Sequence, residues 1–147
     1  MGRIAWGRVI FGGIVAGVLF NAFEFLLHGR MLGVAWRSAM LALGKTEQEI
    51  VASQMTSMTL LLLWAFLACL FGVWLYAAIR PRFGSGPKTA LLAAVATWFG
   101  VTLMPAMVTV AFDLYPSGLV TTWVMGELVG LVVSIFIGAW LYREASA

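Results

Sequence analysis

The sequence predicts an all-α membrane protein with four transmembrane helices in two tandem hairpins and a short interfacial amphipathic helix after the first span. Hydrophobic residues make up 63% of the 147 residues and charged residues only 10%, and the mean hydropathy is +1.00. A soluble domain would carry about 25% charged residues. Four apolar runs each reach the ~20 residues that are needed to cross a ~30 Å hydrocarbon core. We therefore expect a single transmembrane domain over residues 1–147, surrounded by lipid.

The four spans have recognisable limits. They are expected at about residues 6–29, 50–79, 89–113 and 117–142. The first run begins like a signal peptide, but it is too long and lacks a small-x-small cleavage site, so we expect it to be retained as a helix. Proline cannot continue a regular helix, so the second span should stop at Arg80-Pro81 and Pro105 should kink the third.

The segment at about residues 31–43 is too short to span a membrane. Its apolar residues recur at i, i+3 and i+4, which predicts an amphipathic helix in the outer interface with Trp36 as its anchor. Gly44 should end this helix. Thr46 and Glu49 then form a capping box, the usual start of a helix, so the second helix should begin there before it enters the bilayer.

Two short patterns recur along the chain and indicate the tandem hairpins. GVWLY at residues 72–76 closes the second span and GAWLY at 138–142 closes the fourth. AFE at 22–24 and AFD at 111–113 lie near the ends of the first and third spans. Two hairpins of the same orientation would be related by an axis along the membrane normal.

Basic residues predict the orientation through the positive-inside rule. With both termini cytoplasmic, six basic residues lie inside, namely Arg3, Arg8, Arg80, Arg82, Lys88 and Arg143. Three lie outside, namely Arg30, Arg37 and Lys45. Six against three favours both termini inside, for a protein of the bacterial inner membrane, and such scattered charges do not suggest nucleic-acid binding. Cys69 is the only cysteine, which excludes an intramolecular disulfide.

The first 50 residues carry a family resemblance. After a glycine-rich first helix come FLLHGRMLGVAW at residues 25–36 and LGKTEQE at residues 43–49. These segments distantly resemble a group of small bacterial four-helix membrane proteins that is classed as a domain of unknown function. The resemblance implies the same four-helix architecture and carries no activity with it.

Acidic residues inside apolar runs are the strongest functional signal, because an ionised side chain in hydrocarbon costs roughly 2.5 kcal/mol or more. Glu24 lies near the end of the first span, Glu127 lies inside the fourth, and Asp113 is most simply a solvated helix end. The first and fourth spans each also carry a stripe of small residues that permits close packing. The stripes consist of Gly13 and Gly17 on the first span, and of Gly126, Gly130, Ser134 and Gly138 on the fourth. We expect the two stripes to pack together, within one chain or across a dimer.

That packing would assemble a polar layer in the outer half of the bilayer. Its expected members are Asn21, Glu24, His28, Gln54, Ser57 and Glu127. Two carboxyl groups in a low-dielectric site cannot easily both be ionised, so they would share a proton or bind a cation. The alternative is a buried hydrogen-bond network that only fixes how the helices pack.

A metal site has weaker support. Glu24 and His28 are spaced i, i+4, and thioethers with one histidine would suit Cu(I). The candidate ligands are His28, Met55, Met58, Met104 and Met107. Methionine is, however, an ordinary filler of packing gaps. A single histidine and a single cysteine argue against zinc and against a bis-histidine haem, so no cofactor is expected.

These observations predict an inner-membrane homo-oligomer whose outer-leaflet polar pocket binds a proton, a small cation or a small ligand, with transport as one use. The alternative is a non-catalytic accessory or scaffold subunit of a larger membrane complex. A lipid-acting enzyme with Glu24 and His28 as acid and base is a third, weaker hypothesis. No serine-histidine-aspartate set, phosphate loop or HExxH pattern occurs, so enzymatic activity is not expected.

Overall fold

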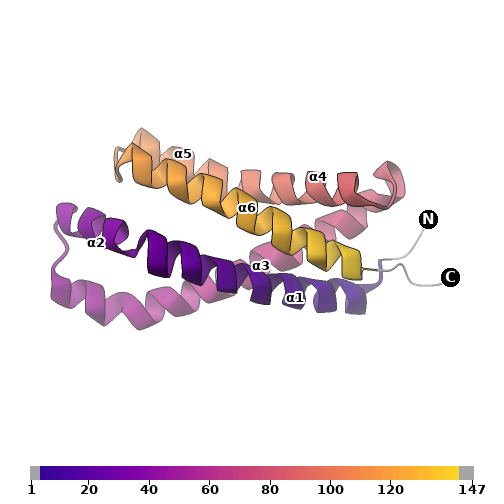
Figure 1. Ribbon diagram of the computed structural model, residues 1–147, viewed down its shortest axis with the longest axis horizontal. Helices are drawn as coiled ribbons and strands as arrows, with labels where there is room; N and C mark the ends of the chain where they lie inside the picture. The colour runs from indigo at the N-terminus through magenta and orange to yellow at the C-terminus, as the bar shows by residue number, and fades with distance from the viewer. Residues whose placement is uncertain (1–3, 143–147) are drawn as a thin grey trace.

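The computed structural model describes residues 4–142, which are helical with short turns and contain no strand (Figure 1). Four helices are long and apolar enough to cross a membrane: Trp6–Met31, Glu47–Phe83, Pro87–Ala111 and Ser117–Leu141. The predicted all-α protein with four membrane-spanning helices is therefore confirmed. Arg3 and Arg143, which contributed to the predicted orientation, lie outside the described residues.

The first span consists of α1 (Trp6–Glu24) and a π-helical segment, η1 (Phe25–Met31). The short helix α2 (Gly33–Ala42) follows, close to the predicted 31–43. Gly44 then takes a positive φ of 88°, which a residue without a Cβ adopts easily. Arg37 of α2 forms a bidentate ion pair with Glu47, which raises the pKa of the guanidinium and links α2 to the next helix. The pair is fully exposed, so it contributes little to stability.

The second span is the long helix α3 (Glu47–Phe83), and its start is the predicted capping box. The Thr46 hydroxyl accepts from the Glu49 backbone N–H, and the Glu49 carboxylate accepts from the Thr46 backbone N–H. The predicted stop at Arg80-Pro81 is wrong, because α3 continues through Pro81 to Phe83. Pro81 lacks the N–H that would bond the Ala77 carbonyl, and the helix continues for only two residues beyond it.

The third span is interrupted. It consists of α4 (Pro87–Trp98), the π-helical segment η2 (Phe99–Leu103) and α5 (Met104–Ala111). The interruption directly precedes the region of Pro105, the residue that was expected to kink this span. The fourth span is the uninterrupted helix α6 (Ser117–Leu141), close to the predicted 117–142.

The helices pack antiparallel around an apolar core. In Figure 1, α1 lies against α3 and α6, and α4 lies against the same two helices on the other side. The described chain begins and ends at one end of the bundle, where the Ala5 backbone N–H donates to the Tyr142 hydroxyl at 3.3 Å. The core includes Phe20, Val73, Leu131 and Ile135, each of which is 0% exposed.

Small residues allow α1 and α6 to approach closely. A Cβ built on Gly12 would lie 2.6 Å from the carbonyl oxygen of Gly138, and one built on Gly138 would lie 2.7 Å from that of Gly12. Farther along, Gly130 faces Phe20 and Phe23, and Gly126 faces Leu27. The stripe on the fourth span therefore packs on the first span within one chain, although not on the stripe that was expected there.

The partner predicted for Gly13 and Gly17 is wrong. A Cβ on Gly13 would meet Leu70, and one on Gly17 would meet Phe66, so both glycines face α3. The reason is helical geometry: consecutive residues are separated by about 100° around the axis. Gly12 and Ala16 face α6, and the next residue in each case is turned toward α3.

We expect Gly13→Ala to lower the free energy of unfolding by about 1–3 kcal/mol, the usual cost of overpacking a core. The new methyl group would lie 2.4 Å from Leu70 Cδ2 and 3.0 Å from the Leu70 Cα. Unfolding in mixed detergent micelles, followed by circular dichroism, measures the change. Gly7→Ala is the matched control in the same helix, because no atom lies within 4 Å of that Cβ. If both variants have the same stability, α1 and α3 are not in the close contact described.

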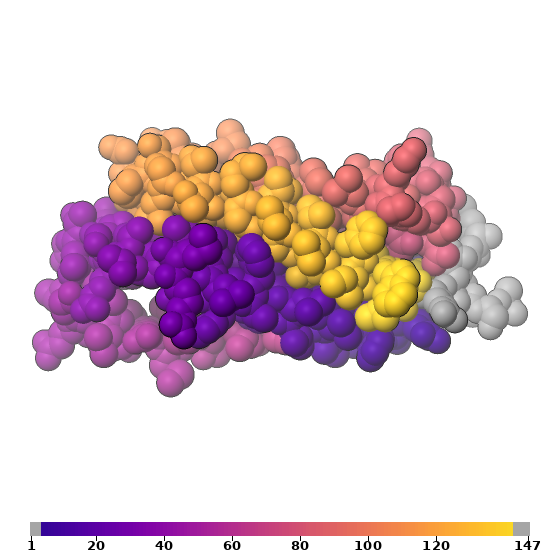
Figure 2. Space-filling model, viewed as in Figure 1, coloured from indigo at the N-terminus to yellow at the C-terminus, as the bar shows by residue number. Residues whose placement is uncertain are grey.

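The first half of α3 leaves the bundle. All residues from 51 to 63 are exposed, and α3 becomes buried only from Ala65 onward. Figure 2 shows an opening between this part of α3 and the end of the first span. Glu24 and His28, at the end of the first span, keep side-chain exposures of 16% and 25%.

Candidate functional site

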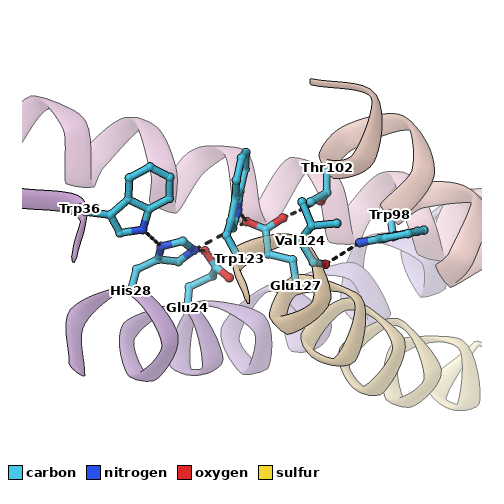
Figure 3. Close-up of polar contacts among 8 residues, drawn as sticks. All are labelled: Glu24, His28, Trp36, Trp98, Thr102, Trp123, Val124 and Glu127. Atoms are coloured by element: carbon cyan, nitrogen blue, oxygen red, sulfur yellow. Dashed lines mark hydrogen bonds and ion pairs between the residues drawn. The ribbon is translucent and has the colours of Figure 1, made fainter. Parts of the chain in front are cut away.

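Six polar side chains form a group around His28, which we call the polar group: Glu24, His28, Trp36, Thr102, Trp123 and Glu127. His28 Nδ1 accepts a hydrogen bond from the indole Nε1–H of Trp36 at 2.9 Å (Figure 3). On the other side of the ring, Nε2 lies 3.3 Å from Glu24 Oε2 and 3.7 Å from Glu127 Oε1. The imidazole thus lies between one tryptophan and two carboxyl groups, as Figure 3 shows.

The two carboxyl groups have different surroundings. Glu127 is 2% exposed and accepts from two donors: the Trp123 indole N–H on Oε1 and the Thr102 hydroxyl on Oε2 at 2.5 Å. Glu24 is only partly buried, but its Oε1 is inaccessible and has no hydrogen-bond partner among the described residues. Glu127 is therefore arranged as a fixed acceptor, and Glu24 is the less satisfied acid.

Three of the four spans contribute to the group. Glu24 ends α1 and His28 lies in η1, while Thr102 lies in η2 and Glu127 in α6. Both π-helical segments thus carry a residue of the group, and such segments occur often at functional sites. The Trp98 indole N–H donates to the Val124 carbonyl at 2.9 Å, which joins the third span to α6 one turn from Glu127.

Packing between α1 and α6 brings the acids together. Gly130 and Gly126 accept the side chains of Phe23 and Leu27, so the helix backbones approach at this height. Glu24 lies between those two residues in sequence, and Glu127 follows Gly126 directly. The close packing of α6 on the first span along this stripe of small residues therefore places Glu127 beside His28.

Aromatic contacts fix the position of Trp36, the residue that donates to His28. Trp36 packs edge-on against Tyr115, with centroids 5.1 Å apart, and against Trp123, with centroids 5.8 Å apart. These contacts fix α2 over the turn between the third and fourth spans. The predicted anchor residue Trp36 is therefore also a direct hydrogen-bond partner of the site.

The structure assembles half of the predicted polar layer. Glu24, His28 and Glu127 meet, whereas Gln54 and Ser57 lie exposed on the diverging half of α3 and do not reach them. Asn21 lies one turn before Glu24 and donates to the Gly17 carbonyl at 2.8 Å. The prediction for Gln54 and Ser57 required this half of α3 to pack against the first span, whereas residues 51–63 are exposed.

The predicted thioether site is not assembled. Met55, Met58, Met104 and Met107 are all exposed, by 54% to 77%, and lie on the surfaces of α3 and α5. Within residues 4–142, single ligand atoms of Glu24, His28 and Glu127 lie within 4.8 Å of one another, a spacing that a metal ion would require.

Asp113 has no part in the group. It is exposed and takes a positive φ of 50° at the end of α5, where the Leu114 N–H donates to the Thr109 carbonyl. Aspartate tolerates this left-handed conformation at helix ends better than most residues. Its predicted role as a solvated helix end agrees with this geometry.

The prediction from sequence missed three members of the group. Thr102, Trp123 and the indole N–H of Trp36 supply hydrogen bonds to Glu127 and His28. Trp123 lies one helical turn before Glu127, and this i, i+4 spacing was a usable signal. Thr102 had no such signal, because it belongs to another span.

No protein-family model, curated protein or solved structure matches this chain. The resemblance to the small four-helix family therefore remains an expectation from the sequence. Any functional conclusion depends on the geometry of the group itself.

Proposed function

We propose that this chain is a multi-pass inner-membrane protein whose Glu24–His28–Glu127 group binds and releases a small cation, the proton included, with a role in transport. The observation that carries the proposal is the convergence of two acids on one imidazole between membrane-spanning helices. Intramembrane ionisable residues are costly, and they commonly mark ion pathways. The exposed edges of Glu24 and His28 would provide access from the opening beside α3.

Glu24 is the group that we assign to carry the exchangeable proton. Its buried Oε1 has no donor, so an ionised Glu24 would leave a charged oxygen unsatisfied. Glu127 has two donors and serves as the fixed negative partner. Protonation of Glu24 would then switch the net charge of the group.

The orientation follows the positive-inside rule. We place the end with Arg8, Arg80, Arg82 and Lys88 on the cytoplasmic side, and α2 in the outer headgroup zone. The polar group then lies in the outer half of the bilayer. In this arrangement the first two spans and the last two form the tandem hairpins, and a homodimer would supply the helix number that is usual in transporters.

We expect Glu24→Gln to reduce proton flux to the level of protein-free liposomes, because the amide imitates a permanently protonated acid. The measurement uses the protein in liposomes that contain a pH-sensitive dye, with an imposed pH gradient and a potassium–valinomycin potential. Asp113→Asn is the matched control: it also removes one acid, but at an exposed turn. Equal flux in the wild type and Glu24→Gln would contradict the proposal.

A scaffold role is the second candidate, and a specific observation favours it. Residues 51–63 of α3 are exposed on every side, so this stretch offers a partner helix a large surface. Under this proposal the acids would only fix the packing of α1 and α6. Native mass spectrometry in mild detergent distinguishes the two: a constant foreign subunit would favour the scaffold, and a self-contained dimer would favour the ion-binding protein.

A further inference from the structure

We propose that Trp36 determines which cation the Glu24–His28–Glu127 group accepts, by holding His28 in the tautomer that admits a proton and excludes metal ions. This inference deepens the proposed function and depends on it. It stands on the position of one indole N–H, 2.9 Å from His28 Nδ1.

The argument begins with the chemistry of the two rings. An indole N–H can only donate, so His28 Nδ1 must be the acceptor and carries no hydrogen. A neutral imidazole with an unprotonated Nδ1 has its hydrogen on Nε2. The Nε2–H therefore points to the side of the ring where Glu24 and Glu127 lie, at 3.3 Å and 3.7 Å.

A metal ion would require the opposite arrangement. Histidine binds a metal through the lone pair of a bare nitrogen, and its other nitrogen then donates its hydrogen to an acceptor. With Nε2 as the ligand, Nδ1–H would face the Trp36 N–H, donor against donor. The second nitrogen of His28 thus has a partner of the wrong kind for a metal site, although the ligand atoms are close enough for one.

The hydrogen on His28 Nε2 also excludes a cation that needs only oxygen ligands. The Nε2–H occupies the approach between the two carboxyl groups, where such an ion would have to lie, and its positive end repels the ion. A proton has no such requirement, because it binds covalently to one oxygen. Protonation of Glu24 leaves both the Trp36–His28 bond and the Nε2–H in place.

The tautomer can be measured directly because His28 is the only histidine in the chain. Protein labelled with ¹⁵N-histidine in detergent micelles gives one pair of ring signals. We expect a protonated Nε2 and an unprotonated Nδ1 in the wild type. A protonated Nδ1 would overturn the inference.

A second experiment tests the exclusion of metal. We expect no Co²⁺ absorption band from the wild type in a titration with Co²⁺ alone and a clear band from Trp36→Phe, because the hydrogen-bond partner of a ligating histidine commonly alters its metal affinity about 10–100-fold. Trp98→Phe is the matched control, because its indole N–H bonds the Val124 carbonyl instead. Co²⁺ affinities that are equal in wild type and Trp36→Phe would overturn the inference.

The two proposals fail in different ways. A wild type that binds Co²⁺ would overturn the role of Trp36 but leave a cation site at the three residues. Proton flux that survives Glu24→Gln would overturn the proposed function, whatever the tautomer of His28. The ¹⁵N measurement needs no variant, so it decides the question even if Trp36→Phe does not fold.

Discussion

Replacing Thr102 by valine and Trp123 by phenylalanine together is expected to lower the free energy of unfolding by about 3–5 kcal/mol, the cost of leaving a buried charge without its partners. Both residues donate to Glu127, which is 2% exposed. A buried carboxylate without donors pays its full desolvation cost. Each single replacement should cost about 1.5–3 kcal/mol, as is typical for hydrogen bonds to charged groups.

A double-mutant cycle separates this effect from simple packing. In a Glu127→Leu background the same two replacements should cost much less, since no carboxylate remains to be satisfied. Thr97→Val is the matched control for the threonine, because Thr97 is also 0% exposed but donates only to the Ala93 carbonyl. Equal costs with and without Glu127 would show that Thr102 and Trp123 act by packing alone.

Gly138→Leu is expected to separate α1 from α6, at a cost of about 3 kcal/mol, the upper end for overpacking. The first added carbon would lie 2.7 Å from the Gly12 carbonyl oxygen, 2.7 Å from Val73 Cγ2 and 3.0 Å from Ala16 Cβ. A backbone oxygen cannot move aside without shifting its helix. Proton flux should fall as well, because the same seam holds Glu127 against His28.

The stability of Gly138→Leu can be measured through the buried thiol of Cys69. This cysteine is free and 0% exposed, so a thiol-reactive fluorescent dye should label it only as the protein unfolds. Heating with the dye then gives a melting curve for each variant. Gly118→Leu is the matched control, the same change in the same helix with no atom within 4 Å of its Cβ. Similar melting temperatures for the two variants would contradict the close packing of α1 on α6.

The exposed half of α3 and the group at His28 are related. Because α3 leaves the bundle before it reaches the height of Glu24, one side of the group stays accessible. Were α3 packed along the whole first span, the acids would be enclosed and a proton would have no evident path. The divergence that removed Gln54 and Ser57 from the polar layer is therefore also what leaves Glu24 and His28 accessible for the proposed exchange of a proton.

The four spans, the capping box at Thr46 and the limits of α6 were predictable from the sequence alone. A membrane-spanning helix satisfies its own backbone hydrogen bonds, so local hydropathy and capping residues are sufficient to locate it. The meeting of Glu24 with Glu127 was also predicted, although the stripe assumed for the first span, Gly13 and Gly17, faces α3 and not α6. Pro81 was misread by two residues, because the helix continues past the proline and ends at Phe83.

Only the tertiary structure decided which side chains meet around those acids. Gly13 faces α3 and Gly12 faces α6, a difference set by the rotation of α1, which no local pattern specifies. Thr102 reaches Glu127 from another span, and Trp36 reaches His28 because α2 folds back over the end of the bundle. Such contacts depend on packing between distant segments, whereas the spans depend on the hydropathy of consecutive residues.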